Sequence, residues 1–242
     1  MSKDECGWSI ENELLKLSRE NDIAAAVRKL ELCRRGQEVK AIRGSASWTI
    51  GGSETYIYPF SIIFADASCE EFILKAVTPF SPSKSIEDVL VEWVSRRRLL
   101  EEAGVNTPTL FFAGEGLILE KLIPHSLKEV LDKARCDEGL ILEVFRYAGV
   151  LHRLGFMPNA PFADLRTDGT HVFAIDFGED LGPAGIVESD STQLYEQALE
   201  WLRKCSVTTT PRQLEIYRTG FLLPGRQEDS TTCERVGAGN HI

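Results

Sequence analysis

One lysine stands out within an apolar segment of the chain. Over residues 72–77 (FILKAV), the side chains of a strand alternate between two faces, and both faces are apolar except for Lys75. A lysine in a buried strand must meet an anionic partner or lose its proton. Glu92, in the helix expected next along the chain, is the first candidate for a buried ion pair. Two simpler interpretations stay open: Lys75 reaches solvent from an edge strand, or Glu92 pairs with Arg96 on its own helix.

Two further segments have residue types suited to binding a phosphate or a metal ion. Residues 51–53 (Gly-Gly-Ser) lie between two strand patterns, and adjacent glycines let backbone N–H groups approach an anion. A plain hairpin would need such glycines too. Asp176 ends an apolar strand and is followed by Phe177 and Gly178. An aspartate in that position is placed to hold a divalent cation.

The elements that must position these residues change in character along the chain. Strand-forming residues dominate from 40 to 77 and again at 109–113 and 117–121. Ser85, followed by Asp88 three residues later, predicts a capped helix that ends at Gly104. Helical spacing predicts the remaining helices over residues 9–38, 126–134, 138–154, 191–204 and 211–222. Asp168-Gly169 predicts the turn of a hairpin between 162–167 and 170–175.

This order of elements predicts an α+β protein with two unlike lobes. Residues 1–121 would form the first lobe, with helices over 9–38 followed by a sheet and one helix over 40–121. Residues 122–224 would form a helical lobe that contains the hairpin. Residues 225–242 are polar and are expected to be a flexible tail. A cleft between such lobes is a usual place for a ligand.

Composition excludes several classes of partner. The 242 residues include 27 Lys and Arg against 37 Asp and Glu, a formal net charge of −10. An acidic chain is repelled by phosphate backbones, so no nucleic-acid partner is expected. The basic run 96–98 shares a helix with acidic residues and is interpreted as a solvated face. No apolar run is long enough to span a membrane. The polar start and six scattered cysteines indicate a cytoplasmic protein with reduced thiols.

Taken in order, these motifs resemble the protein kinase-like superfamily. The closer resemblance is to the aminoglycoside phosphotransferase, lipopolysaccharide kinase and Bud32-like branch, over residues 44 to about 182. Residues 51–53 and 72–75 are similar to its phosphate loop and lysine strand. Glu92 and residues 104–108 (GVNTP) resemble its glutamate helix and the exit from it. Residues 117–122 (LILEKL) look like the hinge between lobes, and residues 151–156 look like the end of the helix before the catalytic loop.

The resemblance implies a bilobal protein kinase-like fold that binds ATP and Mg²⁺. The first lobe would be an antiparallel sheet with one regulatory-type helix, and the second would be helical with a β-hairpin. The residues it implies for nucleotide binding are Gly51, Gly52, Ser53, Lys75, Glu92, Glu120 and Leu122. The residues it implies for the metal are Asp164 and Asp176.

The catalytic loop departs from the family because the expected His-Gly-Asp-x-x-x-x-Asn is absent. With Asp168-Gly169 as the turn, Phe162 would face Ile175. That register puts Asn159 in the catalytic position and Asp164 in the metal position. A second alignment, with residues 162–165 as the catalytic tetrapeptide, stays open.

An asparagine cannot accept a proton at neutral pH. Phosphoryl transfer depends mainly on positioning and charge neutralisation, so two functions stay open. The chain is either an atypical phosphotransferase acting on a small molecule or a protein, or a pseudokinase that serves as a binding or scaffold module. A nucleotide-free structural protein would need Lys75 and Glu92 to be unpaired. The sequence does not indicate the acceptor.

Overall fold

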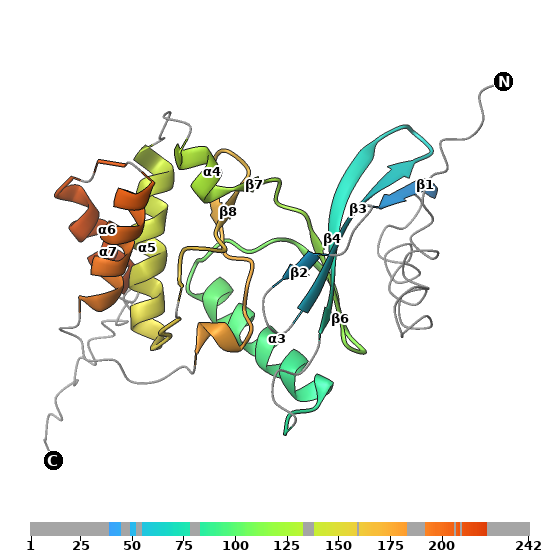
Figure 1. Ribbon diagram of the computed structural model, residues 1–242, viewed down its shortest axis with the longest axis horizontal. Coiled ribbons are helices and arrows are strands. Elements are labelled where there is room, and N and C mark those ends of the chain that lie inside the picture. The colour runs from blue at the N-terminus through green and yellow to red at the C-terminus, as the bar shows by residue number, and fades with distance from the viewer. Residues whose placement is uncertain are drawn as a thin grey trace, which may run out of the picture.

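The computed structural model describes residues 39–44, 49–51, 55–77, 83–132, 138–158, 160–182, 192–205, 207–208 and 210–221. The helices predicted over 9–38 and the tail predicted over 225–242 lie outside these ranges. So do Gly52, Ser53 and Asn159. None of the described helices is long and apolar enough to cross a membrane. Figure 1 shows helices α5, α6 and α7 at one end of the molecule and the larger sheet at the other.

The larger sheet is antiparallel and has the order β1-β3-β4-β6-β5, with β2 also paired to β3. Its strands are β1 (Val39–Gly44), β2 (Thr49–Gly51), β3 (Thr55–Phe64), β4 (Cys69–Val77), β5 (Leu110–Gly114) and β6 (Leu117–Lys121). The strand patterns of the sequence are therefore confirmed.

Pro59 lies inside the long strand β3, where a proline removes a ladder hydrogen bond. It faces Ile73 of β4 on one side. On the other side, β2 pairs only as far as Ile57 and β1 only from Phe60 onward. Pro59 thus falls in the interval between the two described partners, which explains how one strand continues through it.

Helix α3 (Ile86–Glu102) packs against one face of this sheet. The predicted capping box is present: the Ser85 hydroxyl accepts the backbone N–H of Asp88, and the Asp88 carboxylate accepts the N–H of Ser85. The buried face of the helix includes Val89, Trp93 and Leu100. α3 also contacts α5, so it links the sheet to the helices (Figure 1).

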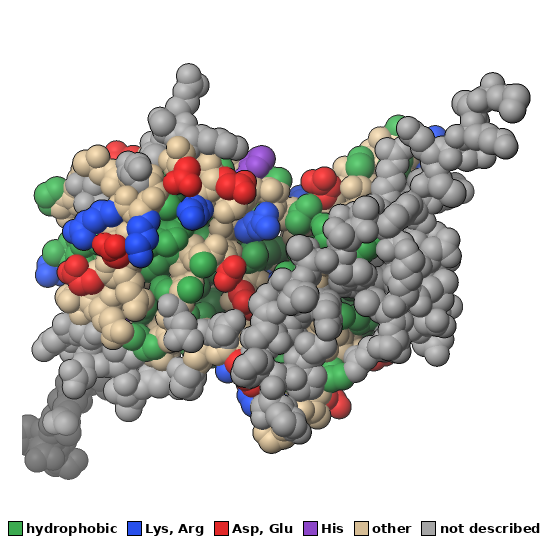
Figure 2. Space-filling view, viewed as in Figure 1, with side chains coloured by type: hydrophobic (Ala, Val, Ile, Leu, Met, Phe, Trp, Pro, Cys, Tyr) green, Lys and Arg blue, Asp and Glu red, His purple; other side chains and the backbone are tan. Residues whose placement is uncertain are grey.

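The second half of the chain is mostly helical. Its helices are α4 (Leu127–Asp132), α5 (Glu138–Leu154), α6 (Gln193–Lys204) and α7 (Arg212–Phe221), with a 3-10 turn at Glu179–Leu181. α5 is the centre of this half, because α6 and α7 both pack on it. On the visible face of these helices, basic and acidic side chains lie side by side (Figure 2). Helices lie in the segments where the sequence predicts them, whereas the arrangement in two lobes and its boundary at residue 121 stay predictions.

A small second sheet contains β7 (His125–Ser126), β8 (Arg166–Thr167) and β9 (Val172–Phe173). Thr167 pairs with Val172, not with Thr170, so the predicted hairpin register is wrong by two residues. The Asp168 carboxylate accepts the N–H groups of Thr170 and His171, both at 2.8 Å. These bonds widen the turn to residues 168–171.

The residues before the hairpin also differ from the strand predicted over 162–167. Residues 161–164 form a turn instead of the start of a strand. Phe162 is buried in the core between the rings of Tyr147 and Trp201. The expected pairing of Phe162 with Ile175 is therefore wrong.

Candidate functional site

Lys75 pairs with Glu120 and not with Glu92. Its ammonium lies 2.8 Å from Oε2 of Glu120 and donates a 2.6 Å hydrogen bond to the carbonyl of Ile175. Strand register explains the partner, because β4 places Ile73 opposite Glu120. Since alternate residues share a face, Lys75 and Glu120 project from the same side of the sheet. The Lys75–Glu92 ion pair expected from the sequence is wrong.

Glu120 is fully buried and bridges two cations. Its second oxygen, Oε1, accepts a short hydrogen bond from Arg97 of α3. Arg97 is itself only 4% exposed. It also donates to Thr107 at 2.9 Å and to the carbonyl of Pro108. A single buried carboxylate thus joins the lysine strand to α3.

Arg97 corrects the interpretation of residues 96–98 as a solvated face. Arg98 does fit that interpretation, because its side chain is 77% exposed and pairs with Glu102 on the same helix. Arg97 points inward, four residues after Trp93. The sequence does indicate that Arg97 is buried, because Arg97 falls in the apolar repeat of the helix. Its place in a run of three arginines suggested a solvated position instead.

Glu92 belongs to a different and more exposed cluster. It contacts Lys84 at 2.9 Å and Arg96 at 3.3 Å. The local pairing with Arg96, left open above, is present. Lys84 also reaches Glu179 at 2.5 Å, just after the Asp-Phe-Gly sequence. Hydrogen bonds from its ammonium to Glu179 and Glu92 raise the pKa of Lys84.

Aromatic rings close the site on the side of α3. The ring of Trp93 meets that of Phe177 edge-on, with 5.1 Å between centroids. The Lys75 ammonium lies 5.6 Å from the centroid of Trp93, and the Arg97 guanidinium lies 5.7 Å from the centroids of both rings. Cations over aromatic faces are stabilised by the ring quadrupole. The sequence did not single out Trp93, which looks like any other core residue of a helix.

Asp164 and Asp176 line one small cavity, of about 30 Å³, together with Tyr147. Asp164 is exposed and Asp176 is partly buried. Oδ1 of Asp176 accepts the N–H of Gly178 at 3.1 Å. Burial, followed by the charges of Asp176 and Asp164, raises the pKa of Tyr147. Asp164 and Asp176 therefore lie near the same buried Tyr147 side chain, although the hairpin register predicted from the sequence is wrong.

The remaining predicted residues are spread around this centre. Gly51 ends β2 and faces Thr55. Leu122 follows β6 and donates its N–H to the carbonyl of Glu71 at 3.0 Å. Among the described residues, no group of three or more His, Cys, Asp or Glu side chains could hold a metal ion by itself. A cation at Asp164 and Asp176 would thus need further ligands from water or a substrate.

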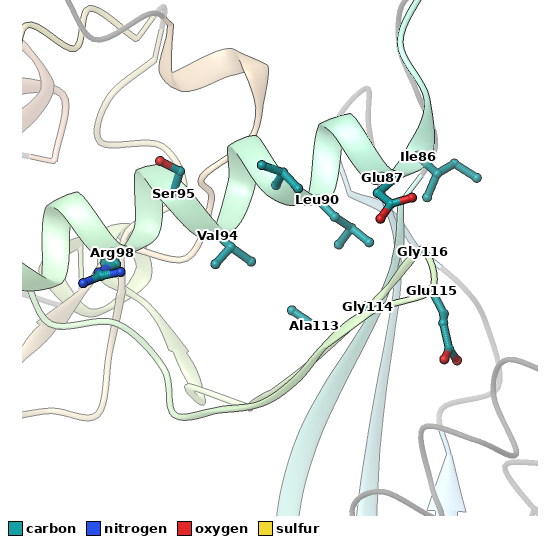
Figure 3. A pocket seen from close by; sticks show the side chains of 11 residues that line it. Ile86, Glu87, Leu90, Val94, Ser95, Arg98, Ala113, Gly114, Glu115 and Gly116 are labelled. Carbon is teal, nitrogen blue, oxygen red and sulfur yellow. The ribbon is translucent and has the colours of Figure 1, made fainter.

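Two larger cavities lie away from Lys75. A groove of about 990 Å³ runs between α3 and the β5–β6 hairpin, lined by Leu90, Val94 and Ala113 among others (Figure 3). No residue predicted for the site lines this groove. A second cavity, of about 530 Å³, lies between residues 160–163 and α6. It adjoins the turn that contains Asp164.

No protein-family model matches this chain, and no curated protein matches it. Among solved structures, the chain is similar to the Rio2 kinase from Chaetomium thermophilum in a complex described as ADP/Mg²⁺-phosphoaspartate. The two chains share 11% sequence identity at a TM-score of 0.44. The match covers 80% of this chain and 65% of that one, so this chain spans less than two thirds of that length. The function must therefore be inferred from the geometry of the site.

Proposed function

We propose that this chain is a kinase-like, ATP-binding protein that acts as an atypical phosphotransferase on a small molecule or a protein. The observation that supports it most is the hydrogen bond from Lys75 to the carbonyl of Ile175. Ile175 directly precedes Asp176. The bond therefore holds Lys75, on the larger sheet, near Asp176, which follows strand β9 of the small sheet. A cation beside a carboxylate suits a nucleotide phosphate bound with a metal ion.

The residues present fit Mg²⁺ and ATP. Mg²⁺ in phosphate-binding sites is usually held by one or two carboxylates, with water and phosphate as the other ligands. Asp164 and Asp176 supply such a pair of carboxylates on one cavity. Bound Mg²⁺ would neutralise charge on the transferred phosphate. An ammonium has three N–H groups. Lys75 donates one of them to the carbonyl of Ile175 and meets Glu120 as an ion pair. Another of its N–H groups would donate to a phosphate oxygen.

Glu120 replaces Glu92 in this proposal as the residue that orients Lys75. Gly51, Gly52 and Ser53 remain the proposed phosphate contact, and Leu122 remains a proposed nucleotide contact. Asn159 remains in the proposed catalytic position and Asp164 in the metal position. The 530 Å³ cavity beside residues 160–163 gives an acceptor room next to Asp164.

A pseudokinase is the second candidate, and the burial of the lysine favours it. Lys75 is only 4% exposed, and its main partner Glu120 is fully buried. Such a lysine can serve the stability of the fold without meeting a substrate. Asn159 would also leave the acceptor hydroxyl without a proton acceptor. Binding without transfer is the behaviour that separates this candidate from the first.

Thermal unfolding with and without ATP and Mg²⁺, followed by an assay of ATP turnover, tests both candidates. A ligand at 100 times its Kd stabilises a protein by about 2.7 kcal/mol, or roughly 5–10 °C in Tm for a chain of this size. An active phosphotransferase would also turn over ATP. Asn159→Asp should raise turnover by about 10²–10⁴-fold, as a positioned base typically does. A nucleotide-dependent shift with no turnover in either protein would favour the pseudokinase, and no shift would exclude both.

A further inference from the structure

The face of the larger sheet turned away from α3 is covered by large apolar side chains. We call this set the aromatic face. Its members are Tyr58, Phe60, Ile62, Phe64, Phe72, Leu74, Leu117 and Leu119. None of them is more than 4% exposed. The rings of Phe60 and Phe72 stack at 5.5 Å between centroids.

The described elements do not account for this burial. An antiparallel sheet that leaves one face to water has polar residues there, whereas this face is apolar along β3, β4 and β6. The buried apolar residues of α3, α4, α5, α6 and α7 all belong to the other core cluster. Within the described ranges, the partly buried apolar residues packed against the aromatic face are Ala76, Phe111 and Phe112. The residues that cover the aromatic face must therefore come from outside the described ranges or from another molecule.

We propose that residues 9–38 of this chain pack over the aromatic face and complete its core. This segment directly precedes β1, which is paired to β3 in the same sheet. It has two successive groups of apolar residues at helical spacing, Ile10, Leu14 and Leu17 followed by Ala24, Val27 and Leu30. Thirty helical residues would reach about 45 Å, which exceeds the length of roughly 33 Å expected for the ten residues of β3.

The other long segment outside the described ranges is a poorer match. Residues 222–242 follow α7, which packs on α5 at the far end of the molecule. They are mostly polar and have no repeat of apolar residues. Neither chain length nor composition therefore favours them as the cover.

The cover would have a consequence for the site, independent of the proposed function. Phe72 and Leu74 of the aromatic face alternate with Lys75 along β4, and Leu119 immediately precedes Glu120 on β6. One side of β4 and β6 thus contributes to the aromatic face, and the other side carries the buried Lys75–Glu120 ion pair. Residues 9–38 would thus fix the strands that position Lys75 and Glu120.

Photo-crosslinking in the full-length chain tests this placement. Phe112 is partly buried and packs against the aromatic face, so Phe112→benzoylphenylalanine keeps an aromatic ring there. The matched control is Val91→benzoylphenylalanine on α3, at a side chain that is 64% exposed. The proposal requires an intramolecular crosslink from position 112 into residues 9–38, and much less from position 91. Crosslinks from position 112 into residues 222–242 or into a second copy, equal yields from both positions, or no crosslink into 9–38 would overturn it.

A second pair of variants does not depend on the photoreactive residue. Leu14→Asp places a charge within the apolar repeat, whereas Asn12→Asp places the same charge about 200° around the predicted helix. Leu14→Asp should lower Tm by about 5 °C or more. Asn12→Asp should change Tm by less than about 2 °C. Equal Tm values for the two variants would contradict the proposal.

Discussion

Glu120→Gln should destabilise this protein more than removing the charge of Lys75 or of Glu92. Glu120 is fully buried, contacts Lys75 at 2.8 Å and accepts a hydrogen bond from Arg97. Gln keeps the shape of the side chain but removes its charge. Both cations would then be left in the interior without their shared anion.

The expected loss of unfolding free energy follows from the burial of Glu120. Removing one partner of a buried ion pair typically costs about 3–5 kcal/mol, or roughly 6–20 °C in Tm for a chain of this size. Lys75→Met should cost less, because Arg97 still neutralises Glu120 in that variant. Glu92→Gln should cost about 0–1 kcal/mol, since its side chain is 38% exposed and its contacts are to Lys84 and Arg96.

Urea denaturation of the three variants, monitored by circular dichroism, measures this order directly. The expected order of destabilisation is Glu120→Gln, then Lys75→Met, then Glu92→Gln. Glu92→Gln is the matched control, because it makes the same chemical change in the carboxylate that the sequence alone suggested. Equal losses for the two Glu→Gln variants would refute the assignment of Glu120 as the buried anion.

Three further predictions concern other parts of the molecule. Asp164→Asn should weaken Mg²⁺-dependent ATP binding in a titration and leave Tm nearly unchanged, because Asp164 is exposed; Asp132→Asn, at the exposed end of α4, should change neither. Burial raises the pKa of Tyr217 to about 12 from 10.0, so the stability it contributes is full below pH 10 and is lost as the pH rises towards 12. Tyr217→Phe should reduce that loss in Tm scans at pH 10 and 11.5, and an unchanged loss would contradict the cause given. A Cβ at Gly220 would collide with the backbone carbonyl of Arg146, so Gly220→Ala should cost about 1–3 kcal/mol in urea denaturation, whereas Thr219→Ala on the exposed side should cost less than about 1 kcal/mol.

Local signals in the sequence were sufficient for most elements. Alternation over residues 72–77 predicted β4, and Ser85 with Asp88 predicted the start of α3. These features depend on neighbours in the chain, so one segment contains the whole signal. The partner of Lys75 does not depend on neighbours. The partner is set by the register between β4 and β6, in which Ile73 lies opposite Glu120.

A signal for Glu120 was nonetheless present. Glu120 follows three apolar residues in the strand 117–121, which is the same argument that singled out Lys75. Two opposite charges in two apolar strands of one sheet suggest each other as partners. The hairpin register failed for a different reason: the Asp168 side chain binds two backbone N–H groups and lengthens the turn. Sequence alone indicated a turn there, but not how many residues it takes.

Calorimetric titration of Mg²⁺-ATP into the wild type and Lys75→Met shows whether Lys75, held by Glu120 beside Asp176, binds a nucleotide phosphate. We expect saturable binding by the wild type that depends on Mg²⁺, and at least tenfold weaker binding by Lys75→Met in a protein that remains folded. Absence of heat in the wild type, or equal affinity in both proteins, would contradict this expectation.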